Sequence, residues 1–214
     1  MSEHGERGRF IALEGGEASG KSTQARLLAA RMGAVLTREP GGTELGRRIR
    51  DLVLRSGAGE PHPRTEALLM AADRAQHVHE VVGPALARGQ DVVTDRFSGS
   101  TLAYQGYGRG LDVADLDRIS GWASDGLEPD VVVLLDVLPP VVRARQHGRR
   151  LDRLEAIGDA FHQRVREGYL ALAAADPDRW VVVDGAGSEE DVAAQVWAAV
   201  SARAAPGSPR GARS

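Results

Sequence analysis

The chain has 214 residues, of which 42% are hydrophobic and 27% are charged, a composition typical of a single soluble globular domain. Its net charge of −3 argues against a surface built for nucleic acid or an anionic membrane, and the absence of cysteine excludes disulfides and thiolate metal sites. No apolar run is long enough to span a bilayer and the polar first nine residues do not resemble a signal peptide, so we expect a cytoplasmic protein.

Short apolar runs alternate with segments of helical spacing along the chain. The apolar runs predict five strands, at residues 10–13, 34–37, 92–94, 131–135 and 180–183. Helical spacing predicts helices at 21–32, 43–54, 113–124, 139–147, 160–175 and 189–203. It also predicts a long helix that Thr65 caps and that Gly83-Pro84 kinks or splits. This alternation predicts an α/β fold with a parallel sheet, whose ligands bind at the carboxyl ends of the strands.

A phosphate-loop pattern lies between the first predicted strand and the first predicted helix. Gly15-Gly16-Glu17-Ala18-Ser19-Gly20-Lys21-Ser22 fits G-x-x-x-x-G-K-[ST], in which backbone N–H groups surround the phosphates of a nucleoside triphosphate. Lys21, the one lysine of the chain, is expected to reach the β- and γ-phosphates, and Ser22 to ligate Mg²⁺. The alternative is a glycine-rich turn that binds nothing, which the strand–loop–helix context disfavours.

Four segments carry a resemblance to a known family. Phe10 to Thr23, the T-R-E-P-G-G-T segment at 37–43, Asp95-Arg96-Phe97 and Ala103-Tyr104-Gln105-Gly106 resemble the bacterial thymidylate kinases in content, order and spacing. The resemblance runs from about Phe10 to Ala202. It implies a three-layer P-loop NTPase fold with a five-stranded parallel sheet and a mobile lid. It also implies transfer of the γ-phosphoryl of ATP to dTMP with Mg²⁺, and an enzyme that forms a homodimer.

The resemblance implies a role for each matching residue on the nucleotide-binding side. ATP would bind at residues 15–23, which end at Thr23. Asp95, which follows a predicted strand, would ligate Mg²⁺ or its waters, although Asp136 also ends a strand and residue chemistry alone does not separate the two. Glu17 would lie near the metal and accept a hydrogen bond from the 3′-hydroxyl of the acceptor.

On the acceptor side, Arg74 and Arg96 would hold the phosphate, since guanidinium groups suit bidentate phosphate contacts. The other expected contacts are Pro40 as one wall, Ser100 and Thr101 around the base, Tyr104 where a 2′-hydroxyl would lie, Gln105 beside the base, and Met70. At the position of Met70 the family usually has a phenylalanine that stacks on thymine. Taken alone, Arg74 could be a surface arginine and Tyr104 an ordinary core aromatic.

The phosphate loop itself contains no arginine, so the cations at the transferring phosphoryl must come from elsewhere. Arg149, Arg150 and Arg153 lie together at 148–158, between two predicted helices, and resemble the lid arginines of the family. Arg153, in an L-D-R segment, is the first choice; a basic surface stretch is the alternative. The expected catalytic set is Lys21, Asp95, Arg96, Arg149, Arg150 and Arg153.

Two other functions remain open: another nucleoside monophosphate kinase, and a P-loop module that binds nucleotide without phosphoryl transfer. A switch GTPase is disfavoured because an N-K-x-D segment is impossible in a chain without lysine after Lys21. We expect residues 10–203 to form one domain between a flexible residue range 1–9 and a disordered tail at 204–214, with ATP and dTMP as the partners.

Overall fold

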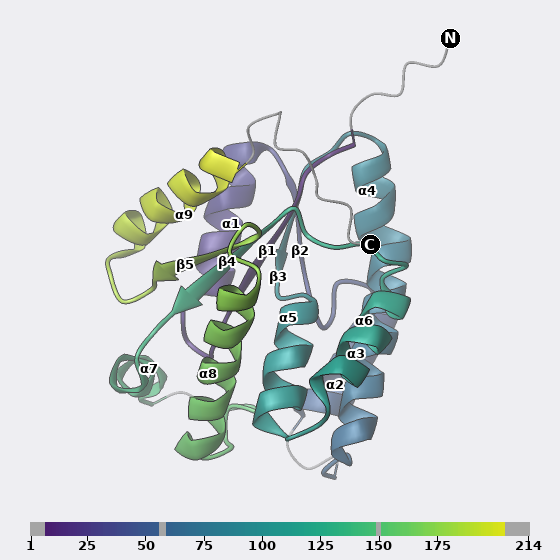
Figure 1. The fold of residues 1–214 in the computed structure, drawn as a ribbon, viewed down its shortest axis with the longest axis vertical. Helices are drawn as coiled ribbons and strands as arrows, with labels where there is room; N and C mark the ends of the chain where they lie inside the picture. Colours follow the sequence, from purple (N-terminus) through teal and green to yellow (C-terminus); the bar gives the residue numbers. More distant parts are fainter. Residues whose placement is uncertain (1–6, 56–58, 149–150, 204–214) are drawn as a thin grey trace.

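The computed structural model describes residues 7–55, 59–148 and 151–203, and its regular elements follow the sequence pattern closely (Figure 1). The strands are β1 (Phe10–Gly15), β2 (Val35–Arg38), β3 (Val92–Asp95), β4 (Val131–Asp136) and β5 (Trp180–Asp184). The α-helices are α1 (Lys21–Met32), α2 (Glu44–Leu54), α3 (Pro63–His77), α4 (Gly83–Ala87), α5 (Ser98–Thr101), α6 (Val113–Ala123), α7 (Pro139–Gln146), α8 (Asp159–Ala175) and α9 (Glu189–Arg203). Two π-helical segments are η1 (Val78–Val82) and η2 (Leu102–Gly108).

The five strands form one parallel sheet in the order β2-β3-β1-β4-β5. β1 lies at the centre, with Leu13 opposite Asp95 of β3 and Gly15 opposite Leu135 of β4. The carboxyl ends of β1, β3 and β4 therefore meet at one edge of the sheet, where the phosphate loop begins. The predicted five-stranded parallel sheet is confirmed.

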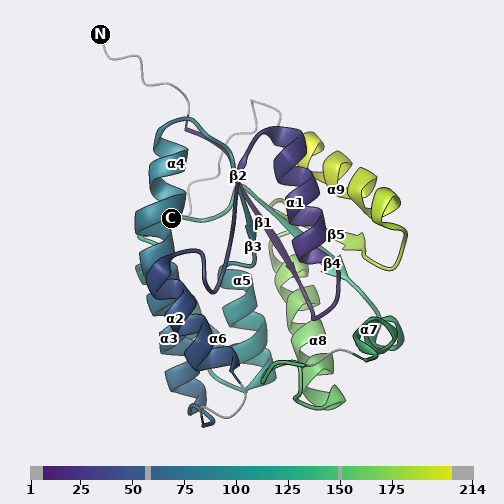
Figure 2. The ribbon, with the colours of Figure 1, turned by 180° about the vertical axis from the view of Figure 1, so that it is seen from behind.

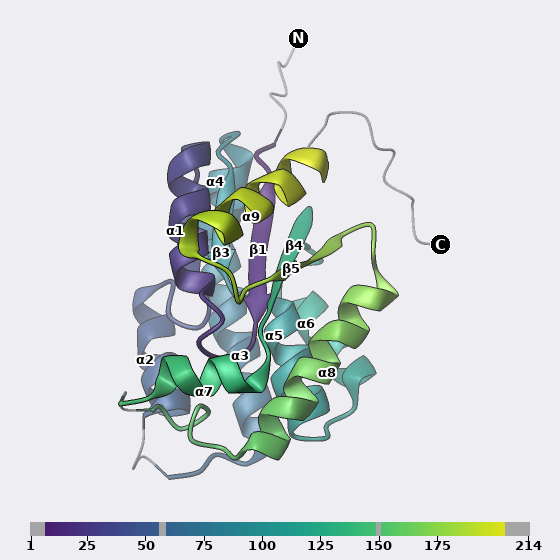
Figure 3. The same cartoon turned by 90° about the vertical axis from the view of Figure 1, so that its left-hand side faces the viewer.

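Helices cover both faces of the sheet, which makes three layers. On one face α1 and α9 pack against Ile11, Leu13 and Val133, and Figure 3 shows these two helices together on one side of the strands. On the other face α4 and α8 pack against Phe10, Ala12 and Leu134. Figure 2 shows α2, α3 and α6 grouped beside the strands. No helix in the described part of the chain is long and apolar enough to cross a membrane.

The structure differs from the predicted helices in three places. α3 begins at Pro63 and is capped by His62, whose Nδ1 accepts from the Arg64 N–H, so Thr65 is not the cap. The break at Gly83-Pro84 lies within continuous helix, because η1 inserts a wider turn and the Gly83 N–H bonds the Val78 carbonyl. The helix over α5 and η2 was not predicted at all.

Candidate active site

The loop between β1 and α1 takes the conformation that its glycines permit. Gly15 has a φ of 146°, and a Cβ at this position would lie 2.5 Å from the carbonyl oxygen of Leu135. Gly20, the N-cap of α1, is in the left-handed region with a φ of 94°. These two glycines let the chain turn sharply so that α1 starts with its N-terminus at the edge of the sheet, a position that favours phosphate.

The Lys21 side chain is enclosed by this loop. Its Nζ donates to the carbonyl oxygen of Gly16 at 2.6 Å and to Oγ of Ser19 at 3.2 Å. Burial, together with the neighbouring Arg96, lowers the pKa of Lys21 to about 8. The ammonium is thus held beside the loop backbone, where a phosphate anion would stabilise its charge.

Ser22 and Asp95 meet at the ends of α1 and β3 and form the candidate magnesium site. The Ser22 hydroxyl donates to Oδ2 of Asp95 at 2.5 Å, whereas Oδ1 of Asp95 is buried without a hydrogen-bond partner. The two oxygens of Asp136 instead accept from Arg166, each at 2.7 Å. The described residues contain no cluster of three His, Asp or Glu that could hold a metal. Ser22 and Asp95 still fit Mg²⁺, which usually takes one or two protein ligands together with phosphates and waters.

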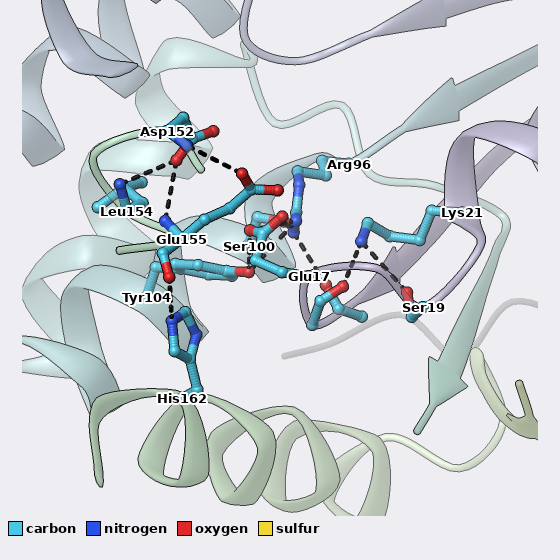
Figure 4. A network of polar contacts seen from close by, with 12 residues as sticks. Glu17, Ser19, Lys21, Arg96, Ser100, Tyr104, Asp152, Leu154, Glu155 and His162 are labelled. Atoms are coloured by element: carbon cyan, nitrogen blue, oxygen red, sulfur yellow. Dashed lines mark hydrogen bonds and ion pairs between the residues drawn. The ribbon is translucent and has the colours of Figure 1, made fainter. Parts of the chain in front are cut away.

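Arg96 lies at the centre of the polar network drawn in Figure 4, between the phosphate loop and the acceptor side. Its guanidinium donates to the Gly15 carbonyl at 2.9 Å and to Oε1 of Glu17 at 2.8 Å. Tyr104 also donates to Oε1 of Glu17, at 2.5 Å. The backbone of Arg96 has a φ of 74°, a conformation that costs a non-glycine residue about 1–3 kcal/mol and is often found at functional sites.

Glu17 is ionised in this network. Burial acts to raise its pKa, but the charges of Arg96 and Lys21 outweigh burial and lower the pKa of Glu17 to about 2. Glu17 therefore accepts hydrogen bonds at neutral pH and has no proton to give. Figure 4 shows it lying between Lys21 and Arg96, at the boundary between the phosphate loop and the acceptor side.

A second buried carboxylate, which was not predicted from the sequence, binds two hydroxyl groups that also contact Arg96. Glu14 accepts from the Ser100 hydroxyl at 2.6 Å and from the Tyr169 hydroxyl at 3.1 Å. Both hydroxyls also accept from Arg96 at 3.1 Å. Burial raises the pKa of Glu14. A glutamate within an apolar strand was the signal for this network, because a buried carboxylate requires partners; nothing local marked Tyr169.

One cavity at the carboxyl end of the sheet gathers all the side chains expected to bind the acceptor. It is lined by Glu17, Pro40, Met70, Arg74, Arg96, Ser100, Thr101, Tyr104 and Gln105, and also by Glu39, Arg50, Leu54, Phe97, Asp152 and Leu154. These residues come from the phosphate loop, the segment after β2, α2, α3, α5, η2 and the segment before α8. The unpredicted helix over α5 and η2 thus brings four of the expected residues to one wall.

Arg74 is a buried member of this cavity and not a surface arginine, since only 2% of it is exposed. It forms an ion pair with Glu39 at 2.9 Å and donates to Oγ1 of Thr101 at 3.1 Å. Glu39 also contacts Nδ1 of His77 at 2.8 Å. His77 and Glu39 are further residues that the sequence analysis did not single out.

Arg153 does not occupy the position expected for it. Its Nε donates to the Val53 carbonyl at 2.7 Å, its terminal nitrogen contacts Glu66, and its backbone N–H bonds the Leu54 carbonyl at 3.1 Å. These contacts hold it against the end of α2 and the start of α3, and it lines neither the acceptor cavity nor the neighbouring one. The other two expected lid arginines, Arg149 and Arg150, lie outside the described residues.

A second, larger cavity of about 390 Å³ lies on the other side of Glu17, between the phosphate loop, the end of β4, α7 and α8. Close to it, Arg145 of α7 donates to the Ala18 carbonyl at 3.1 Å and to the Gly185 carbonyl at 2.8 Å. Arg145 thus joins the phosphate loop to the turn after β5. Nothing in the sequence marks Arg145 as functional, because α7 carries two arginines and no motif separates them.

Comparison with known proteins agrees with this geometry. The profile of the family described as thymidylate kinase matches residues 13–196. The chain belongs to the thymidylate kinase family. It is 49% identical over 207 residues to a thymidylate kinase of Synechococcus sp. (strain JA-3-3Ab), covering 94% of this chain and 99% of that one. It is 51% identical over 196 residues to that of Leifsonia xyli, covering 88% and 92%.

A solved structure supports the same family. The thymidylate kinase of Ehrlichia chaffeensis matches with a TM-score of 0.73 and 32% identity, covering 90% of this chain and 98% of that chain. The predicted P-loop NTPase fold and the resemblance to thymidylate kinases are thereby confirmed. The chain is an ATP-dependent phosphotransferase of the nucleoside monophosphate kinase class.

Proposed function

We propose that this chain transfers the γ-phosphoryl of ATP to dTMP, giving dTDP and ADP for dTTP biosynthesis. The observation that carries the proposal is the single cavity beside the phosphate loop, which contains all nine side chains that the family resemblance assigns to the acceptor. Family membership and relatives at about half identity support the same substrate. A module that only binds nucleotide would not need this second set of side chains beside the phosphate loop.

On the donor side, the phosphates of ATP bind the backbone N–H groups of residues 15–23 and the Lys21 ammonium. The adenosine lies toward the turn after β5, which Arg145 joins to the loop. Ser22 and Asp95 would hold Mg²⁺, which supplies positive charge at the phosphate oxygens when bound. This arrangement leaves the γ-phosphoryl facing Glu17 and the acceptor cavity.

On the acceptor side, Arg96 and Arg74 hold the dTMP phosphate, and Glu17 accepts from the 3′-hydroxyl. An oxygen of the dTMP phosphate forms a bond to the γ-phosphorus while the bond from that phosphorus to the β–γ bridging oxygen breaks. The electron pair leaves with ADP. Because the second pKa of a phosphate monoester is about 6, the acceptor is already anionic at neutral pH and needs no general base. The ionised Glu17 fits a positioning role.

The base is held by the remaining residues of the cavity. Met70 lies against the base, where a polarizable thioether can contact an aromatic face. Tyr104, fixed by its hydrogen bond to Glu17, occupies the place of a 2′-hydroxyl and so favours deoxyribose. Ser100 and Thr101 border the base, Gln105 lies beside it, and Pro40 forms the opposite wall.

The lid at about 148–158 supplies the cation at the transferring phosphoryl and excludes water. Since Arg153 is bound to Glu66 in this conformation, Arg149 and Arg150 are the better candidates for that contact. The enzyme works as a cytoplasmic homodimer built from the single domain at 10–203, with neither nucleic acid nor membrane as a partner. These last points rest on the family resemblance and the composition.

The acceptor assignment is tested by Arg96→Lys, which keeps the charge but loses the planar fork. We expect kcat/KM for dTMP to fall about 10²-fold or more, because a bidentate guanidinium contact is not replaced by an ammonium. The affinity for Mg-ATP should change less than about threefold. Arg166→Lys is the matched control, since the Arg166 guanidinium binds both oxygens of Asp136 but lines the other cavity. Unchanged dTMP kinetics in Arg96→Lys would place the acceptor elsewhere.

A further inference from the structure

Glu66, in the first turn of α3, is a fully buried carboxylate that the phosphoryl transfer described above does not use. Three donors from two segments converge on it: two from η2 and the residue after it, and one from the segment before α8. Nε2 of Gln105 donates to its Oε1 at 2.8 Å, a terminal nitrogen of Arg109 donates to its Oε2 at 3.1 Å, and Arg153 contacts the same Oε2. Burial acts to raise its pKa, but hydrogen bonds from Arg153, Gln105 and Arg109 outweigh burial and hold the pKa of Glu66 below its ordinary value.

An ionised carboxylate only accepts hydrogen bonds, and this fixes the orientation of the Gln105 amide. If the amide were reversed, its oxygen would face the Glu66 oxygens, and two acceptors would meet in a buried site. Gln105 therefore keeps its NH₂ on Glu66, and its Oε1 remains as the acceptor. Gln105 lines the acceptor cavity, and no described residue donates a hydrogen bond to this oxygen.

This acceptor complements a base edge that offers a ring N–H. Thymine and uracil present N3–H on that edge, whereas cytosine presents a bare N3, which is itself an acceptor.

We propose that Glu66 is a positioning residue for base selection, which acts by holding the Gln105 amide so that its carbonyl oxygen faces the base and favours a 4-oxopyrimidine over a 4-aminopyrimidine. This inference rests on the proposed function, because it concerns the acceptor of the same reaction. It makes selectivity depend on a residue that does not line the acceptor cavity.

The test compares dTMP with 5-methyl-dCMP, two acceptors that differ at N3 and the 4-position and share the methyl group. For the unmodified enzyme we expect the ratio of kcat/KM values to favour dTMP by about 10³-fold or more, since buried groups left unpaired by the wrong base are costly. In Glu66→Gln, the new amide can present either its oxygen or its NH₂ to Gln105, so the Gln105 amide is free to reverse. We therefore expect the ratio of kcat/KM values to fall at least about tenfold. The kcat for dTMP at saturation should change much less than the ratio.

Gln105→Met removes the oriented amide and should reduce the ratio by a similar factor. In the double variant with Glu66→Gln, the ratio should be the same as in Gln105→Met alone, because both changes act through this amide. Gln105→Met also serves if Glu66→Gln does not fold. Arg109→Gln is the control, since it removes another partner of Glu66 but leaves the bond to Gln105 in place. Its ratio should equal that of the unmodified enzyme.

The proposal is overturned if Gln105→Met keeps the ratio within threefold of the unmodified enzyme, or if a folded Glu66→Gln does so. It is also overturned if the unmodified enzyme prefers 5-methyl-dCMP. If the unmodified enzyme transfers phosphoryl to neither acceptor, the proposed function fails instead. Dissociation constants of dTMP and 5-methyl-dCMP by calorimetry then still test the base selection by itself.

Discussion

Asp73, on α3, is a buried carboxylate that lowers the stability of the folded protein at neutral pH. It is 1% exposed, and its Oδ1 accepts from the Gly41 N–H at 2.9 Å, while Oδ2 is buried without a partner. Burial and the neighbouring Glu39 carboxylate raise the pKa of Asp73 to about 6, against the weaker effects of His77 and Arg74. The folded state therefore binds a proton that the unfolded chain releases near pH 4.

Because this folded-state pKa lies above the unfolded value, the stabilisation from that proton is present below about pH 4 and is lost as the pH rises through 6. Asp73→Asn mimics the protonated form and keeps an oxygen for Gly41. We expect it to match the unmodified protein at pH 4 and to be more stable at pH 7.5, by up to about 3 kcal/mol. Urea unfolding of both proteins across this range measures the difference, and parallel stability curves would contradict the prediction.

The two carboxylates at the ends of β3 and β4 are expected to differ in their effect on metal dependence. Asp95 has a buried free oxygen beside Ser22, whereas both oxygens of Asp136 are occupied by Arg166. Asp95→Asn should raise the Mg²⁺ concentration for half-maximal kcat about 10- to 100-fold. Asp136→Asn should leave it unchanged. Calorimetry of ATP binding with and without Mg²⁺ gives a reading independent of turnover, and equal effects of the two variants would contradict the assignment.

At the scale of elements, Arg153 joins the segment before α8 to the end of α2 and the start of α3. It satisfies the Val53 and Leu54 carbonyls, which the helix leaves unpaired at its end, and it pairs with Glu66. Asp152 and Leu154, on either side of it, line the acceptor cavity. The same contact therefore fixes one wall of that cavity.

This placement gives Arg153→Ala a distinct kinetic signature. We expect KM for dTMP to rise about tenfold and the melting temperature to fall, because a buried ion pair and the side-chain contact with the Val53 carbonyl are lost, while the backbone bond to the Leu54 carbonyl remains. The kcat should fall less than it does in Arg149→Ala or Arg150→Ala, in which we expect a loss of about 10³-fold for the residue that contacts the phosphoryl. A loss of that size in Arg153→Ala, with KM unchanged, would return Arg153 to the transferring phosphoryl.

Elements whose evidence is local were predictable from the sequence. The strands and α1 carry apolar runs or helical spacing. Asp112 and Ser188, residue types that favour helix N-caps, cap α6 and α9 and accept from the N–H groups of Asp115 and Asp191. The helix over α5 and η2 was missed because Ser98-Gly99-Ser100-Thr101 has the composition of a loop. It is helical because tertiary contacts hold it, including those of Glu14 with Ser100 and Phe97.

The candidate site likewise contains residues that were predictable from local motifs and residues that were not. Lys21, Asp95 and Arg96 belong to compact motifs, so residue type and spacing revealed them. Glu14, Glu66 and Tyr169 act through partners 39 to 155 positions away in the chain, and such pairings depend on the completed fold. Arg153 was found by its motif, but its contacts with α2 and Glu66 were not predictable.

At the scale of the whole molecule, two cavities meet at Glu17 and the phosphate loop. The acceptor cavity is only about 80 Å³ in this conformation, below the several hundred Å³ of an ordinary ligand site. Glu17 lines both cavities, so the two adjoin at this carboxylate.

The most direct test of this account is a phosphotransfer assay with Mg-ATP and each of dTMP, dUMP, CMP, UMP, AMP and GMP, following both ADP release and the diphosphate product. We predict strong turnover of dTMP, weaker turnover of dUMP and negligible turnover of the ribonucleotides. Preference for another monophosphate would contradict the thymidylate assignment and leave the kinase. The absence of any diphosphate, from protein shown to be folded and to bind ATP, would contradict phosphoryl transfer itself.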